Sequence, residues 1–255
     1  MSRLFQLRPA LLVLTILSAL SVSAPAQDHD HGGSTTAKSS EQEFSGDPYM
    51  LGTDPVTSEK LVPIDKQIVI QHEGRELRFN SDKSVSAFRA DPAKVLTQVD
   101  AALVTQQLPY YPLQTCPISG EKLGGMGKPV DLVYRNRLVR LCCNGCKSKF
   151  LKDSGKFVTK LDAAVVAAQG PKYPLKTCVV SGEELGGDMG DPIDYVVGNR
   201  LVRLCCKGCK KKVTKDPVTY LAKLDASDSG KGHDKKGDGH GHGDDDDGHG
   251  GHGDH

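Results

Sequence analysis

Hydrophobic and polar positions along the chain predict a short β-hairpin followed by a helix. Two stretches, Val130 to Tyr134 and Arg137 to Leu141, have the composition of strands. Arg135-Asn136 joins them, and residues tolerant of positive φ suit such a tight connection. A helix is expected to start near Gly145 or Cys146. Apolar residues at helical spacing are expected to face the hairpin as core, at Phe150, Phe157, Val158, Leu161 and Val165.

This pattern is repeated along the chain. The segment YPLQTCPISGEKLGG, which starts at Tyr111, returns 62 positions later as YPLKTCVVSGEELGG. NRLVRLCCNGCKSKF, from Asn136, returns as NRLVRLCCKGCKKKV, from Asn199, and a more distant copy starts at Tyr49. The turns equivalent to Arg135-Asn136 are Gly198-Asn199 and Glu73-Gly74. We therefore expect three modules, over residues 47–104, 109–168 and 171–226, each with a loop, a hairpin and a helix.

The N-terminal segment has the features of an export signal. Arg3 and Arg8 precede a short apolar run from Leu11 to Leu20, and Ala24-Pro25-Ala26 offers small residues for cleavage. The run is too short to span a bilayer, although an uncleaved signal anchor is the alternative. We predict a signal peptide over residues 1–26, a disordered linker over residues 27–46, and a periplasmic or secreted protein with no stable membrane anchor.

Composition favours small modules over a single large core. Aromatic residues make up 5% of the chain, Trp is absent, and the formal net charge is +1. This balance gives no overall bias toward nucleic acid. Residues 227–255 are rich in His, Asp and Gly and carry no apolar side chain, so this tail is expected to be disordered.

All eight cysteines lie in the second and third modules, four in each. Thiolates are soft ligands suited to Cu(I) and Zn(II), and a helix N-terminus favours the thiolate form. The first module carries Asp54, Asn80, Ser81 and Ser84 at the equivalent positions, so we expect it to be a structural or interaction copy. The candidate ligands are Cys116, Cys142, Cys143 and Cys146 in the second module, and Cys178, Cys205, Cys206 and Cys209 in the third.

At these residues the chain resembles the YHS/TRASH family of small metal-binding modules. That family pairs one Cys in an N-terminal loop with a Cys-x3-Cys at a hairpin-to-helix junction, which Cys116, Cys142 and Cys146 match. In the third module the matching residues are Cys178, Cys205 and Cys209. A loop, a hairpin and a helix, with thiols in the loop and at the helix start, predict a treble-clef-like module. The resemblance implies a role in heavy-metal sensing, transport or delivery. The additional Cys143 and Cys206, and the first module without thiols, depart from the family pattern.

Two alternative hypotheses for the cysteines are structural disulfides and thiol–disulfide exchange. Four Cys in a small exported module can form two structural disulfides. Cys143-x-x-Cys146 and Cys206-x-x-Cys209 have the spacing of a thiol–disulfide oxidoreductase, but no thioredoxin-like pattern surrounds them. His72, the only His inside the modules, is expected to be structural, and no arrangement of residues predicts an enzyme.

The histidines near both termini are further candidate metal ligands. Imidazoles among carboxylates suit Cu(II), Ni(II) and Zn(II), although a purely solubilising tail is the alternative. Cleavage after Ala26 would place His29 third in the mature chain, where the α-amine, two backbone amides and the imidazole suit square-planar Cu(II) or Ni(II). These candidates are His29, His31, His233, His240, His242, His249, His252 and His255.

Together these observations predict an α+β protein of tandem treble-clef-like modules with disordered termini. The predicted function is metal buffering, delivery or resistance, with copper or zinc bound. A disulfide-stapled interaction module whose tails bind metal incidentally is the alternative. The expected partners are metal ions and a membrane metal transporter or another exported metalloprotein, with no nucleic acid.

Overall fold

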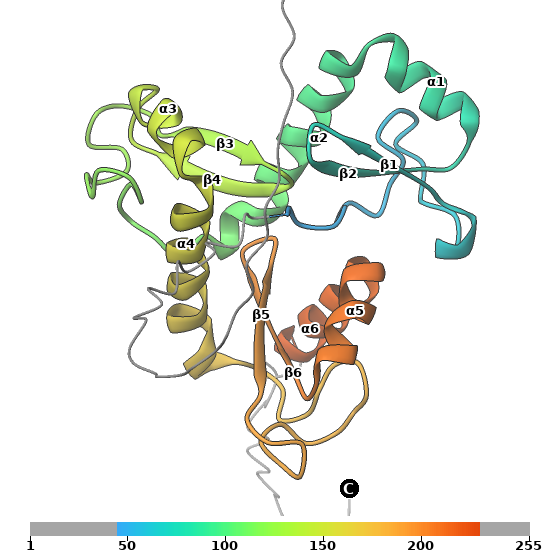
Figure 1. The fold of residues 1–255 in the computed structure, drawn as a ribbon, viewed down its shortest axis with the longest axis vertical. Helices are drawn as coiled ribbons and strands as arrows, with labels where there is room; N and C mark the ends of the chain where they lie inside the picture. Colours follow the sequence, from blue (N-terminus) through green and yellow to red (C-terminus); the bar gives the residue numbers. More distant parts are fainter. Residues whose placement is uncertain (1–44, 230–255) are drawn as a thin grey trace, which may run out of the picture. The chain divides into compact units, whose positions relative to one another are not determined.

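The computed structural model describes residues 45–229, and each repeat in this range forms a two-stranded antiparallel hairpin followed by two helices (Figure 1). In the first module these are β1 (Ile68–His72), β2 (Arg75–Phe79), α1 (Asp82–Ala90) and α2 (Pro92–Gln107). In the second they are β3 (Val130–Tyr134), β4 (Arg137–Leu141), α3 (Gly145–Lys152) and α4 (Ser154–Gln169). In the third they are β5 (Ile193–Val197), β6 (Arg200–Leu204), α5 (Lys207–Lys215) and α6 (Pro217–Ser229). Short 3-10 helices cover Ile64–Lys66 (η1), Leu108–Tyr110 (η2) and Gly170–Lys172 (η3).

This architecture confirms the α+β class, while the treble-clef likeness stays a prediction. The predicted signal peptide, nearly all of the linker and the tail beyond Ser229 lie outside the described residues. Helix α6 continues to Ser229, three residues past the predicted module boundary at residue 226. No helix among residues 45–229 is long and apolar enough to cross a membrane.

The hairpins match the strands predicted from the sequence. Strands β3 and β4 have the predicted bounds, and their register pairs Val130 with Leu141 and Tyr134 with Arg137. Both turn residues have positive φ in every module, which is the geometry of a type I′ turn. The turns are Glu73-Gly74, Arg135-Asn136 and Gly198-Asn199.

The single helix predicted after each hairpin is instead two helices. The first helix of each module ends at an aspartate, after which the second helix begins. These residues are Asp91, Asp153 and Asp216. A proline follows in the first and third modules, where it removes a backbone donor and disfavours helical backbone at the preceding residue. The Asp91 and Asp216 side chains cap the second helices by accepting from the N–H groups of Lys94 and Thr219.

The predicted core residues divide between two clusters. Phe150, Val158 and Leu161 are buried with the three matching cysteines of the second module, and Phe157 packs against them. Val165 does not face its own hairpin, because it packs with Val196 and Leu201 of the third module. His72 contacts Phe88 edge to face in the first module, in keeping with a structural role.

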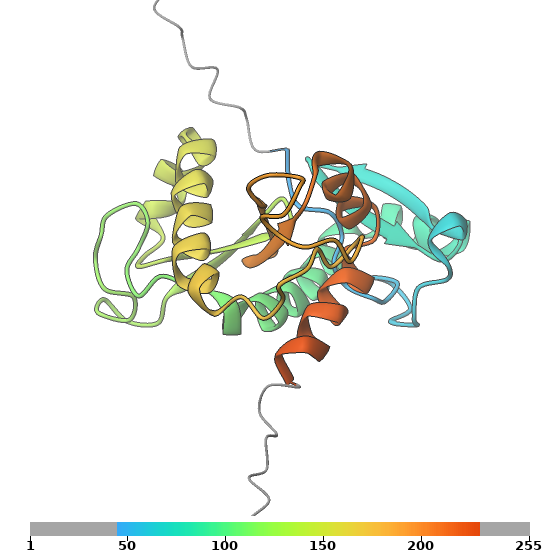
Figure 2. The ribbon, with the colours of Figure 1, turned by 90° about the horizontal axis from the view of Figure 1, so that it is seen from below.

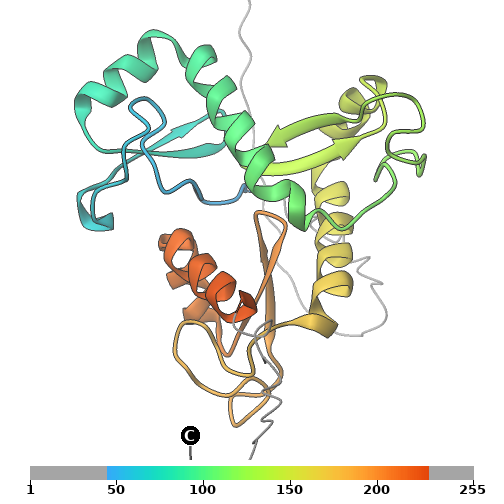
Figure 3. The same cartoon turned by 180° about the vertical axis from the view of Figure 1, so that it is seen from behind.

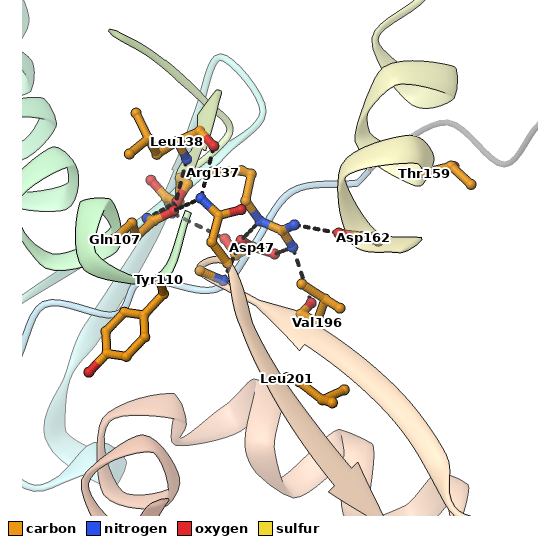
Figure 4. Close-up of polar contacts among 12 residues, drawn as sticks. Asp47, Gln107, Tyr110, Arg137, Leu138, Thr159, Asp162, Val196 and Leu201 are labelled. Carbon is orange, nitrogen blue, oxygen red and sulfur yellow. Dashed lines mark hydrogen bonds and ion pairs between the residues drawn. The ribbon is translucent and has the colours of Figure 1, made fainter. Parts of the chain in front are cut away.

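The second helix of each of the first two modules packs against the hairpin of the next one: α2 against β3 and β4, and α4 against β5 and β6 (Figure 3). Gln107, the last residue of α2, binds the second hairpin with both ends of its amide (Figure 4). Its Nε2 donates to the Asn136 carbonyl and its Oε1 accepts from the Leu138 N–H, both at 2.8 Å. Gln169, 62 positions later, makes the same two bonds to Asn199 and Leu201. The junction between modules is therefore repeated along with the modules.

An Arg–Asp ion pair recurs between the second strand and the second helix of every module. Arg75 pairs with Asp100, Arg137 with Asp162, and Arg200 with Asp225. Arg137 is the only one of these arginines that is fully buried, and Asp47 supplies it with a second carboxylate (Figure 4). Asp47 also accepts from the Gly198 N–H at 2.8 Å, so one carboxylate connects all three modules.

Candidate metal centre

The second and third modules each bring three buried thiols together. Cys116, Cys142 and Cys146 have sulfur atoms that all lie within 4.8 Å of one another, and Cys178, Cys205 and Cys209 repeat the arrangement. The Cys142 and Cys146 sulfurs are 3.7 Å apart, as are those of Cys205 and Cys209. All eight cysteines are free thiols in this structure.

The first thiol of each cluster sits in a tight loop that precedes the hairpin. Figure 2 shows the long loops that lead into the hairpins of the second and third modules. The Cys116 N–H donates to the Glu121 carbonyl, and the Gly120 N–H donates back to the Cys116 carbonyl. Gly120 has a φ of 79°, a backbone conformation that glycine adopts without steric cost. Gly182 has the same role beside Cys178, with a φ of 80°. The repeated Ser-Gly-Glu sequence is therefore the turn that aims the loop cysteine at the helix start.

The other two thiols come from the junction between hairpin and helix. Cys142 follows directly on strand β4, and Cys146 lies in the first turn of α3. The Cys146 N–H donates to the Cys143 carbonyl at 3.2 Å, and Cys209 makes the equivalent bond to Cys206. A strand end and a helix start held in this way fix the spacing of the Cys-x3-Cys pair.

The loop thiols are held in an environment that favours the thiolate. Burial alone would raise the pKa of Cys116, but hydrogen bonds outweigh it and lower the pKa to about 6. The donors are the backbone N–H groups of Cys142, Ser119 and Ile118 and the Ser119 hydroxyl. The matching environment lowers the pKa of Cys178 to about 6 as well.

The thiols at the helix start, Cys146 and Cys209, have raised pKa values instead. Burial, together with hydrogen bonds to Cys142 and Cys116, raises the pKa of Cys146 to about 12. Burial, together with hydrogen bonds to Cys206, Cys205 and Cys178, raises the pKa of Cys209 to about 12. The metal-free cluster thus pairs a loop thiolate with a neutral helix thiol that donates toward it.

Two serine hydroxyls complete the clusters, and the sequence reasoning did not single them out. Ser119 Oγ lies 3.4 Å from Cys142 Sγ, and Ser181 Oγ lies 3.3 Å from Cys205 Sγ. Both belong to the Ser-Gly-Glu turn, so their repetition beside a repeated Cys was the available signal. Each hydroxyl also hydrogen-bonds the loop thiol of its module and so connects two members of the cluster.

The fourth thiol of each module lies at the edge of the cluster. Cys143 and Cys206 are partly exposed, while the other six thiols are buried. Cys143 Sγ is 3.8 Å from Cys142 Sγ, and Cys206 Sγ is 3.6 Å from Cys209 Sγ. Backbone N–H groups at the helix start, that of Cys146 foremost, lower the pKa of Cys143, and Cys209 has the same effect on Cys206. They were predicted as ligands together with the other three, but only the three buried thiols of each module lie mutually within 4.8 Å.

The first module holds the equivalent positions together without thiols. The Asp54 carboxylate accepts from the backbone N–H groups of Val56, Thr57 and Asn80. The Ser81 hydroxyl caps α1 by accepting from the Ser84 N–H at 3.2 Å. Internal hydrogen bonds therefore replace the cluster in this module.

The three thiols of each cluster lie close enough together to hold a metal ion. An ion about 2.3 Å from each thiolate holds the sulfurs roughly 3.8–4.0 Å apart in tetrahedral or trigonal geometry. The spacing of 3.7 Å between the Cys142 and Cys146 sulfurs is close to this range, and the other pairs in the cluster lie within 4.8 Å. The predicted histidine ligands near both termini lie outside the described residues.

Comparisons with known proteins add no assignment to this geometry. No family model matches the chain, and no curated protein and no solved structure matches it significantly.

Proposed function

We propose that this chain is an exported metal-binding protein, and not an enzyme, that captures copper or zinc for buffering, delivery or resistance. The supporting observation is the three-thiol cluster, which occurs twice with the same loop, the same strand end and the same helix start. Buried thiolates prefer Cu(I) and Zn(II) over hard cations, and three of them form most of a trigonal or tetrahedral site. The resemblance to YHS/TRASH modules supports the same proposal.

The first module supports a metal role for the cysteines in the other two. It keeps the hairpin, the two helices and the Arg–Asp pair, yet it has no thiols. The shared fold therefore does not depend on cysteine, and the thiols of the second and third modules serve another purpose. Delivery implies a partner that accepts the ion, and we propose a membrane transporter or another exported metalloprotein.

The test is metal stoichiometry in the reduced full-length protein. Cu(I) titrated anaerobically should fill two thiolate sites per chain, seen in the ultraviolet sulfur-to-copper charge-transfer band, which the tail histidines do not produce. Replacing both Cys146 and Cys209 with Ser should remove that band or weaken binding at both sites. Ser84→Ala, at the matching position of the first module, is the control and should leave the titration unchanged. A reduced wild-type protein that binds no metal through sulfur would overturn the proposal.

A further inference from the structure

Each cluster has a fourth cysteine beside it, Cys143 or Cys206, which is partly exposed and is called the exposed thiol below. Cys143 and Cys206 contact a buried cysteine at one side and solvent at the other. The same placement occurs in both modules, although the sequence after the pair differs, with Asn144 in one and Lys207 in the other. The exposed thiol is therefore a repeated feature of the metal centre.

The fold does not need a thiol at this position. Cys206 is the N-cap residue of α5, with φ −156° and ψ 165°. Ser81 is the N-cap of α1 with nearly the same backbone, φ −158° and ψ 159°. Since a hydroxyl serves this position in the first module, the thiol contributes something that a hydroxyl does not, which is a soft ligand.

The exposed thiols are also poorly placed as permanent ligands. Each cluster is closed by three buried sulfurs from the loop, the strand end and the helix. An ion held there would lie among buried side chains, and Cys143 or Cys206 is the one thiol of its module that contacts a cluster cysteine and is also partly exposed to solvent. Exposed lysines follow these cysteines closely in the sequence, Lys147 after Cys143 and Lys207 after Cys206, and their charge favours the approach of an anionic metal–thiolate complex.

We infer that Cys143 and Cys206 are transfer ligands, through which thiolate-bound Cu(I) enters and leaves the buried sites. This inference rests on the proposed function. On entry, a bond between the ion and a donor thiolate breaks as the bond to the exposed sulfur forms, and the proton of the exposed thiol passes to the departing donor. The ion then binds the buried sulfurs, whose thiol protons are released to water, and the exposed sulfur takes up a proton as its bond to the ion breaks. The ion keeps its oxidation state throughout, so no oxidant or reductant is required.

The experiment compares affinity with exchange rate in the full-length protein. The variant Cys143→Ser/Cys206→Ser places serine at the positions where the first module has Ser81, and it is expected to fold. Loaded anaerobically with two equivalents of Cu(I), it is mixed with the chromophoric chelator bicinchoninate, and transfer is followed by stopped-flow absorbance. The variant should keep both ions with unchanged affinity, while transfer slows about tenfold in both directions, since only the barrier changes.

The variant Cys146→Ser/Cys209→Ser is the matched comparison and should lose affinity. If Cys143→Ser/Cys206→Ser loses as much affinity as that variant, the exposed thiols are ordinary site ligands and the inference is wrong. Unchanged affinity with an unchanged rate would also overturn it. In either case the wild-type protein still binds two ions, so the proposed function stands. The proposed function fails only if the wild-type sites bind no Cu(I).

Discussion

Asp54 in the first module and Cys116 in the second, 62 positions apart in the sequence, occupy equivalent pockets of backbone N–H groups. Three donors at matching positions surround each side chain: Val56, Thr57 and Asn80 around Asp54, and Ile118, Ser119 and Cys142 around Cys116. The pocket therefore binds a negatively charged side chain, whether that side chain is a carboxylate or a thiolate. A carboxylate fills it where no metal is expected, and a thiolate fills it where the metal site is proposed.

This pocket predicts how Cys116 variants behave. In the metal-free protein, Cys116→Asp should be more stable than Cys116→Ala by about 1–3 kcal/mol, because alanine leaves buried N–H donors without an acceptor. Urea unfolding under reducing conditions measures the difference. Both variants should lose one of the two sulfur-bound ions. Equal stability of the two variants would show that the pocket does not select an anion.

Metal binding should release more protons at low pH than at neutral pH. The pKa of Cys116 is lowered from 9.0 to about 6, so its ionised form stabilises the metal-free fold fully above pH 9, and that contribution is lost as pH falls through about 6. The pKa of Cys146 is raised to about 12, so this thiol gives up a proton on binding throughout the accessible range.

Below pH 6 the Cys116 thiol must also lose a proton when the metal binds. The slope of the logarithm of Cu(I) affinity against pH should therefore increase by about one proton per site below pH 6. The charge-transfer band restricts the measurement to sulfur-bound copper and so excludes the histidines of the tail. An affinity independent of pH between 5 and 8 would contradict these pKa shifts.

The first module should keep its structure when the other two are stripped of metal. The Asp54 and Ser81 hydrogen bonds close its loop and helix start without an ion. Hydrogen exchange of the chelator-treated full-length protein should leave the amides of β1, β2 and α2 protected. The amides around Cys116 and Cys146 should exchange faster than in the metal-loaded protein. Loss of protection over residues 68–107 on chelation would be the opposite result.

Arg137 should matter far more to stability than its counterpart in the third module. Arg137→Ala leaves Asp47 buried without its partner and should cost about 3–5 kcal/mol. Arg200→Ala is the matched control, because its partner Asp225 is half exposed. Its cost should be about 1–2 kcal/mol, including the loss of its stacking on the Tyr110 ring. Comparable costs in urea unfolding would show that Asp47 does not depend on Arg137.

Local pattern was enough to predict the hairpins, while of the four thiols predicted as ligands in each module, three lie in the buried cluster. Strands β3 and β4 and their turn follow from short-range rules, since a tight hairpin needs positive φ at Arg135 and Asn136. The meeting of Cys116 with Cys142 and Cys146 followed from the repeat and the family resemblance. These features depend on residues within one module.

Features that depend on contacts between modules were not predicted. Val165 has the spacing of a core residue, but periodicity does not say which hairpin covers it, and it packs on the next module. The pair between Arg137 and Asp47 joins residues 90 positions apart, and a buried arginine contradicts ordinary burial preferences.

The helix break within the second module had no clear signal in the sequence. Asp153 is not followed by the proline that follows Asp91 and Asp216, so the pattern of the second module predicts one continuous helix.

X-ray absorption at the metal edge tests the central claim most directly. The reduced full-length protein, loaded with two equivalents of zinc or Cu(I), should show about three sulfur neighbours per ion, near 2.3 Å for zinc. The shell of sulfur neighbours should be the same for the two ions bound to one chain, because the two clusters have the same arrangement of thiols. A shell of nitrogen and oxygen with one sulfur or none would contradict the account and assign the metal to the termini instead.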